Sequence, residues 1–262
     1  MKRLSLTTAA LAVALTAPLA GTAAAESAAY PVKDPKLNAN PLYKAGTLPT
    51  TACEEPPVKK NDRKLARAYF DAVVACLETT WKKHLTDAGL PYQKVRVKHV
   101  DKFPKKYCGY TPEREDSQSW YCDKNRTMAV QIGKSWLKEP SDLWLFYIAT
   151  SLYGYHVQNL VGIADAYDAV PYDTKAELHE QSRRYALQSD CFAGAFAKSV
   201  WPLKGRTAKD WNYLVSLVDG DGPDDERVLG KASSARAWIK RGFAGGDPGS
   251  CNTWAASSSK VA

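Results

Sequence analysis

The sequence lacks the short patterns that most often mark metal and nucleophile sites. No C-x-x-C pair occurs and no cysteine stands near a histidine, so the spacing of a Cys/His metal site is absent. The G-x-S-x-G turn that exposes the nucleophile of many hydrolases is also missing. Histidine itself is scarce, with 4 residues in 262. These absences exclude a cysteine-based metal site and a serine nucleophile of that kind.

Long apolar runs are absent as well. After the first 25 residues no segment reaches about 18 uninterrupted apolar residues, which excludes a membrane span of the usual length. The basic stretch at residues 94–106 (KVRVKHVDKFPKK) has neither aromatic interleaving nor a known binding motif. We therefore predict a solvated strand and loop there, and no nucleic-acid partner.

The first 25 residues have the features of a signal peptide. Lys2 and Arg3 precede an apolar segment at residues 4–19, and Ala23 to Ala25 supply the small residues of a cleavage site. The sequence therefore predicts a secreted, extracellular protein of one domain. Its formal charge of +8 falls to +6 once the two leader cations are removed, so electrostatic contact with anionic envelope polymers is possible.

Six cysteines in an exported chain indicate three disulfides, although six cysteines allow many connectivities. Chain order favours pairing each cysteine with the next one along the sequence. The expected pairs are Cys53 with Cys76, Cys108 with Cys122, and Cys191 with Cys251.

Apolar periodicity predicts a mainly helical α+β fold. Residues 62–88 repeat at helical spacing until Gly89, and residues 142–162, which Ser141 can cap, are apolar almost all round, as in a helix at the centre of a domain. Strands are expected only at residues 95–100 and 127–133. Further helices are expected at 174–200, 208–218 and 224–241, an extended arm at 26–60 and a flexible tail at 255–262.

Three separated blocks resemble a known family. They are YGYHVQNLVGI at residues 153–163, ALQSDCFAGAF at 186–196 and SSARAWIKRGFAGGDPGSCNTW at 233–254. In order and spacing they are similar to the closing half of the active-site helix, the third-ligand helix and the final segment of the bacterial neutral zinc metallopeptidases. The resemblance implies a zincin-like domain over residues 61–254, with a small sheet and a central former active-site helix.

The positions that carry chemistry in that family are replaced here. Aligning Gly154 with the glycine of the family's H-E-x-G-H places Ser151 and Tyr155 at the two histidine ligands and Leu152 at the general-base glutamate. Ala186 stands at the glutamate that would be the third ligand. Hydroxyl groups are poor zinc ligands and hydrocarbon side chains are none. We therefore expect no catalytic residue, metal or cofactor, with zinc retained only if this interpretation is wrong.

Three other residues are candidates for the former cleft: Tyr155, His156 and Asp190. The family's aspartate at position 190 would orient a metal-bound histidine, and with tyrosine at 155 we expect a hydrogen bond from its hydroxyl to Asp190. His156 lies about 100° around the helix from position 155, which favours a core or cleft-edge histidine over a ligand.

The leading hypothesis is a secreted pseudopeptidase that binds a peptide or protein in the cell envelope or medium. One alternative is an active hydrolase with a relocated or atypical metal site. Another is a structural envelope protein. Metal content and peptide cleavage separate the first hypothesis from the second.

Overall fold

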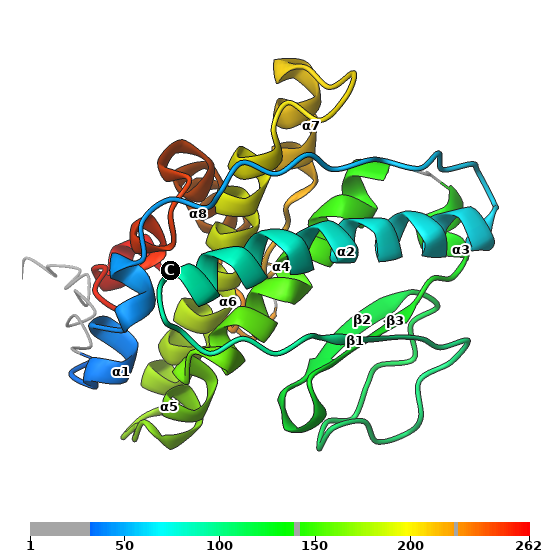
Figure 1. Cartoon of the computed structure of the whole chain (residues 1–262). Helices are drawn as coiled ribbons and strands as arrows, with labels where there is room; N and C mark the ends of the chain where they lie inside the picture. Colours follow the sequence, from blue (N-terminus) through cyan, green and yellow to red (C-terminus); the bar gives the residue numbers. More distant parts are fainter. Residues whose placement is uncertain (1–31, 139–141, 223–224) are drawn as a thin grey trace, which may run out of the picture.

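The computed structural model describes residues 32–138, 142–222 and 225–262, so the predicted leader and the Ser141 cap lie outside it. A mainly helical α+β fold with one small sheet is confirmed (Figure 1). Within these ranges no helix is long and apolar enough to cross a membrane. The α-helices are α1 (Pro35–Asn38), α2 (Arg63–Asp87), α3 (Lys134–Lys138), α4 (Asp142–Leu160), α5 (Ile163–Ala169), α6 (Lys175–Val200), α7 (Ala208–Leu217) and α8 (Ala232–Gly245), and the strands are β1 (Arg96–His99), β2 (Gln118–Cys122) and β3 (Thr127–Gln131).

The predicted apolar helix is α4, and it lies between α2 and α6 at the centre of the molecule (Figure 1). Its crossing with α6 is very close at Gly154, where an added Cβ would lie 2.8 Å from the Cα of Ser189. Only glycine allows this approach without a shift of the backbone. Gly162 then ends the segment in the left-handed conformation, with φ of 76°.

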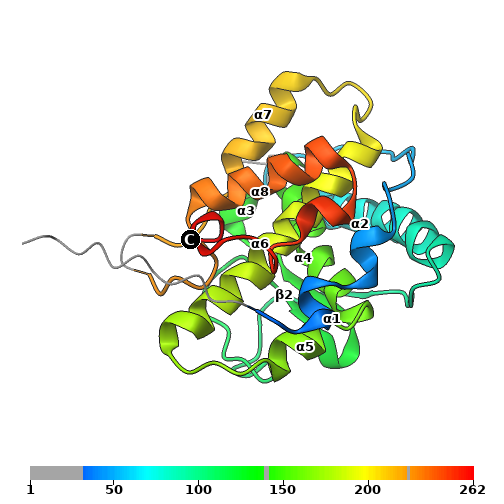
Figure 2. The same cartoon turned by 90° about the vertical axis from the view of Figure 1, so that its left-hand side faces the viewer.

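Helix α6 begins where the sequence predicted, because the hydroxyl of Thr174 accepts a hydrogen bond from the backbone NH of Glu177 at 3.2 Å. Its second half packs along α8, as Figure 2 shows. Two glycines make this contact possible: a Cβ at Gly194 would lie 2.0 Å from a carbonyl oxygen of α8, and one at Gly242 would lie 1.9 Å from a carbonyl oxygen of α6.

The sheet has the order β1-β3-β2, with β3 parallel to β1 and antiparallel to β2. The two predicted strands are present as β1 and β3, whereas β2 was not predicted. Every residue of β3 is buried, but four of the five residues of β2 are only half-buried. The sequence of β2, QSWYC, accordingly lacks the alternation of apolar and polar residues that marks a strand with one buried face.

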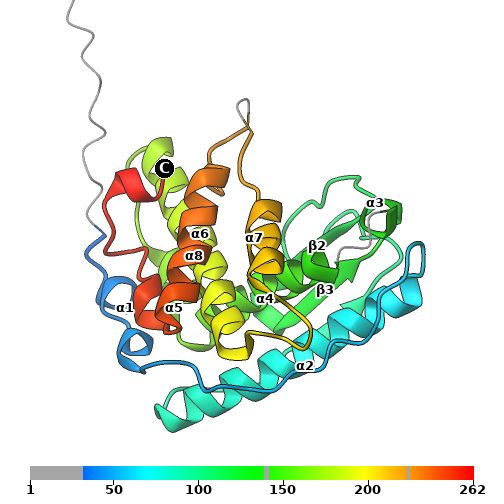
Figure 3. The same cartoon turned by 90° about the horizontal axis from the view of Figure 1, so that it is seen from above.

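The two ends of the described chain differ from the sequence prediction. The segment expected to be an extended arm contains α1 and a 3-10 helix, Pro41–Lys44, and buries Leu37 and Leu42 completely. Beyond this 3-10 helix the chain runs along α2 (Figures 1 and 3). The expected flexible tail instead packs on the domain, with Val261 fully buried and the indole NH of Trp238 donating to the carbonyl of Lys260 at 2.8 Å. Both segments bury apolar side chains that show no periodicity in the sequence.

Helix boundaries differ from prediction in the second half of the chain. Helix α8 starts at Ala232 rather than near residue 224, because the carboxylate of Asp221 accepts hydrogen bonds from the backbone NH groups of Leu229 and Gly230 and holds this segment as a loop. The short helices α3 and α5 were not predicted.

All three expected disulfides are present. Their Cα atoms lie 5.8 Å apart for Cys53 and Cys76, 5.6 Å for Cys108 and Cys122, and 5.4 Å for Cys191 and Cys251. The first connects the N-terminal segment to α2, the second closes the loop before β2, and the third attaches the segment after α8 to α6.

Candidate functional site

Ser151, which the resemblance aligns with the family's first histidine ligand, forms hydrogen bonds between α4 and α6. Ser151 Oγ, on α4, donates to Asp190 Oδ1 on α6 at 2.8 Å, and the hydroxyl of Tyr147 donates to the same oxygen at 3.0 Å. Ser189 Oγ donates to the carbonyl of Ser151 and joins the two helices again. The donors to Asp190 are therefore Ser151 and Tyr147, whereas the sequence predicted Tyr155.

Asp190 is almost completely buried, with 8% of its surface exposed. Burial raises the pKa of its carboxyl to about 6, and the hydrogen bonds from Ser151 and Tyr147 oppose that rise because they stabilise the charged form. The carboxyl thus ionises near neutrality, with hydroxyl groups as its neighbours.

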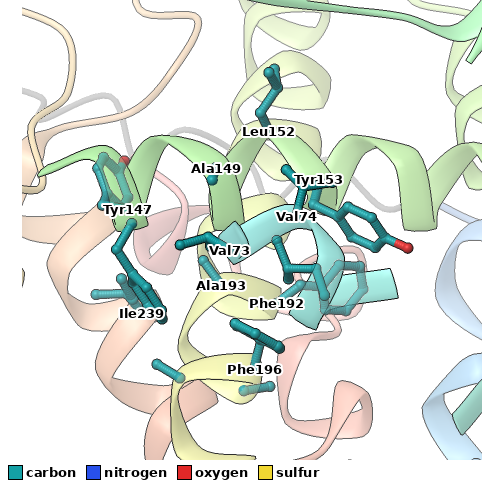
Figure 4. Packing of buried hydrophobic residues seen from close by; sticks show 14 of the residues in the cluster. Val73, Val74, Tyr147, Ala149, Leu152, Tyr153, Phe192, Ala193, Phe196 and Ile239 are labelled. Atoms are coloured by element: carbon teal, nitrogen blue, oxygen red, sulfur yellow. The ribbon is translucent and has the colours of Figure 1, made fainter. Parts of the chain in front are cut away.

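The general-base position faces a cavity. In Figure 4 Leu152 points away from the packed side chains of α2, α6 and α8, and it lines a cavity of about 450 Å³. Tyr155 lines the same cavity, with its ring centroid 5.2 Å from that of Tyr185. Burial raises the pKa of the Tyr155 phenol, so it remains neutral at physiological pH. Ala186, at the third ligand position, is buried and offers no ligand atom.

These residues do not fit a catalytic zinc ion. Such an ion takes three ligands from imidazole, thiolate or carboxylate groups, whereas Ser151, Leu152, Tyr155 and Ala186 offer only hydroxyl and hydrocarbon groups, and the carboxylate bonded to Ser151 is that of Asp190. Within the described part of the chain, three potential metal-binding side chains come together in one place, which is away from Ser151 and consists of Cys108, Cys122 and Asp123. There the two cysteines form a disulfide, so neither provides a thiolate.

His156 is a core residue, which is one of the two positions that the sequence favoured for it. It is fully buried and does not line the cavity. Its Nε2 lies 2.8 Å from the carbonyl oxygen of Gln93 and its Nδ1 lies 2.9 Å from the hydroxyl of Tyr121. A carbonyl can only accept, so Nε2 carries the proton and Nδ1 accepts from the tyrosine. Burial lowers the pKa of this histidine to about 4, so the ring is neutral at pH 7.

Half of the residues in the cavity wall are aromatic, and they come from separate parts of the chain. The wall contains residues of the loop before β2, of β2 and the turn after it, of α4 and α5, of the first half of α6, and Leu229 from the loop before α8. The sequence analysis found only Tyr155 and Leu152 among its residues, because nothing in the sequence marks the others as neighbours. The aromatic lining residues are Tyr110, Trp120, Tyr121, Tyr155, Tyr167 and Tyr185, and two carboxylates, Asp123 and Asp168, complete the polar part.

Comparisons with known proteins give one consistent result. The chain is 25% identical over 215 residues to "Uncharacterized protein YpfJ" of Escherichia coli K12, covering 75% of this chain and 74% of that protein. It is 28% identical over 222 residues to "Uncharacterized protein Rv2575" of Mycobacterium tuberculosis, covering 69% and 68%. No solved structure matches. The sequence profile described as "Putative neutral zinc metallopeptidase" matches residues 38–210, more than half of the chain. This chain therefore belongs to the neutral zinc metallopeptidase family.

Proposed function

We propose that this protein is a secreted member of the family that no longer hydrolyses peptides. It instead binds a peptide or protein segment in the cavity that Leu152 and Tyr155 of α4 line. The observation that carries the proposal is the hydrogen bond from Ser151 to Asp190 at 2.8 Å. Where the family has an imidazole on zinc, this chain has a hydroxyl already paired with a buried carboxylate.

The loss of hydrolysis follows from the chemistry of the four replaced positions. A zinc peptidase needs three ligands to hold the metal and a base to take a proton from the attacking water. The serine hydroxyl is a poor zinc ligand, the tyrosine at position 155 has a raised pKa and stays protonated, and leucine and alanine contribute neither a ligand nor a base. The family description names zinc, so the expectation of a metal-free protein remains a prediction for measurement.

The cavity supports the binding function. It has a volume of about 450 Å³, and tyrosine and tryptophan make up half of the residues that line it. Aromatic side chains give large contact areas at low conformational cost and suit the recognition of peptide side chains. Leu152, at the position of the lost base, adds an apolar surface to the floor.

Secretion is part of the proposal. The three disulfides support it, because structural disulfides form and persist mainly in oxidising compartments. The leader at residues 1–25 supplies the export signal, and the functional domain is assigned to residues 61–254.

The test combines metal analysis with peptide cleavage and peptide binding. Protein purified without a polyhistidine tag is dialysed, its zinc content is measured, and it is incubated with a broad peptide mixture followed by mass spectrometry. We expect far less than about one zinc per chain, no cleavage, and retention of a subset of peptides after gel filtration. Near-stoichiometric zinc together with cleavage would refute the loss of hydrolysis. If no peptide is retained, the binding function fails.

A further inference from the structure

The aromatic residues of the cavity form two stacked pairs. The rings of Tyr167 and Tyr185 have centroids 4.6 Å apart with planes 7° apart, and those of Tyr110 and Trp120 have centroids 5.7 Å apart with planes 26° apart. All four residues line the cavity, and Tyr155 extends the first pair through its contact with Tyr185. A group entering the cavity therefore meets several π-systems, whose faces carry partial negative charge.

The charged groups of the cavity lining are acidic. Asp123 follows β2 and is half-buried, while Asp168 on α5 is exposed at the rim. Among the described residues neither carboxylate forms an ion pair within 4.0 Å. Asp165 adds a third negative charge close to Asp168, while Lys124 acts on Asp168 and Arg126 acts on Tyr121 as cations outside the lining. The charged side chains that line the cavity are thus both acidic, in a chain whose formal net charge is +8.

We propose that the cavity binds the positively charged side chain of an arginine or lysine residue of a peptide. The inference rests on the proposed binding function and adds to it the chemical class of the ligand. A guanidinium or ammonium group is attracted to the face of Tyr and Trp rings, most strongly where water is excluded. Guanidinium can also stack on such rings and pair with a carboxylate through two parallel hydrogen bonds.

The geometry disfavours the other classes of side chain. An acidic side chain would meet Asp123 and Asp168 as like charges, which is unfavourable at short range. A neutral aliphatic side chain would gain contact area but would leave the two carboxylates without a counter-charge. The cavity should therefore discriminate by charge as well as by shape.

A matched pair of peptides tests the inference. Acetyl-Ala-Arg-Ala-amide and the same peptide with citrulline in place of arginine have nearly the same shape, but citrulline is uncharged. We expect isothermal titration calorimetry to give at least about tenfold tighter binding for the arginine peptide, since both the ring faces and the carboxylates favour the cation. The difference should shrink at high salt, because the rim carboxylate is exposed to screening.

Variants assign the effect to the cavity. Asp168→Asn and Asp123→Asn each remove one negative charge at little change in shape, and each should weaken binding of the arginine peptide by about tenfold and binding of the uncharged citrulline peptide by much less. Glu54→Gln removes an exposed carboxylate that does not line the cavity and should change neither affinity. Circular dichroism confirms that each variant is folded.

The outcomes separate this inference from the function on which it rests. If arginine and citrulline peptides bind equally well, the cavity binds peptides without selecting charge and the inference is overturned. The same conclusion follows if Asp168→Asn and Asp123→Asn each leave the preference for the arginine peptide over the citrulline peptide at its wild-type size. If neither these peptides nor the broad mixture binds, the proposed function fails together with the inference.

Discussion

Asp190 links the structure of the former metal site to a measurable pH dependence. Burial raises the pKa of this carboxyl to about 6, compared with about 3.9 for an aspartate in an unfolded chain. The difference is about two pH units at about 1.4 kcal/mol each, so ionisation of Asp190 costs the folded protein about 3 kcal/mol. Since the folded pKa is the higher one, the native state holds the proton between about pH 4 and pH 6, and stability falls as the pH rises through this range.

Asp190→Asn should remove the loss of folding stability that the ionisation of Asp190 causes as the pH rises. The amide keeps an oxygen that can accept from Ser151 and Tyr147 but cannot ionise. We expect variant and wild type to have similar free energies of unfolding near pH 4, and the variant to be more stable by up to about 3 kcal/mol near pH 7.5. Urea denaturation at both pH values measures the difference, with Glu54→Gln as the exposed control. An equal difference between variant and wild type at the two pH values would refute the reasoning.

Three further predictions concern α4 and its neighbours. Ser151→His combined with Tyr155→His and Ala186→Glu should rebuild three convergent ligands and bind about one zinc per chain by metal analysis; a folded variant that binds no more zinc than wild type would show that the alignment is shifted. His156→Gln should remove the contribution of this histidine to the pH dependence, a stability loss of about 3 kcal/mol from about pH 6.5 down to pH 4, because the unfolded histidine gains a proton there that the folded one, with its pKa near 4, does not. This slope is opposite in sign to that of the buried carboxyl, and an unchanged slope in urea denaturation would contradict it. Gly194→Ala should lower the free energy of unfolding by about 3 kcal/mol or more, since the new methyl group overlaps the backbone of α8, and a thermal melt matching wild type would count against the close packing.

The long helices could be predicted from the sequence because their signals are local. Residues 62–88 and 174–200 combine apolar spacing with a capping side chain, and the structure has α2 at Arg63–Asp87 and α6 at Lys175–Val200. The disulfide pairs followed from chain order. Strand β2 could not be found in the same way, because its partner β3 lies across a turn and its side chains are only partly buried.

For the candidate site, the sequence allowed a prediction about the ligand positions but gave no sign of the cavity. Alignment to the family blocks predicts that Ser151, Leu152, Tyr155 and Ala186 replace the catalytic residues, and their side-chain types predict that they do not hold zinc. The cavity could not be predicted, since residues such as Trp120 become neighbours of α4 only through tertiary packing. The sequence left His156 as a core or cleft-edge residue and could not decide between the two, because the hydrogen bonds that hold it in the core come from the Tyr121 hydroxyl and a distant loop carbonyl.

The packed C-terminal segment has a consequence for the resistance of the protein to proteases. Arg183 donates to the carbonyl of Val261 at 2.7 Å, and the buried Arg184 donates to the carbonyl of Ala256 at 2.9 Å while paired with Glu180. A protease needs its substrate in extended form, so it can cut this segment only after these bonds open. Digestion should therefore report the local opening of the segment, and its rate should follow the population of the undocked state rather than the exposure of individual residues.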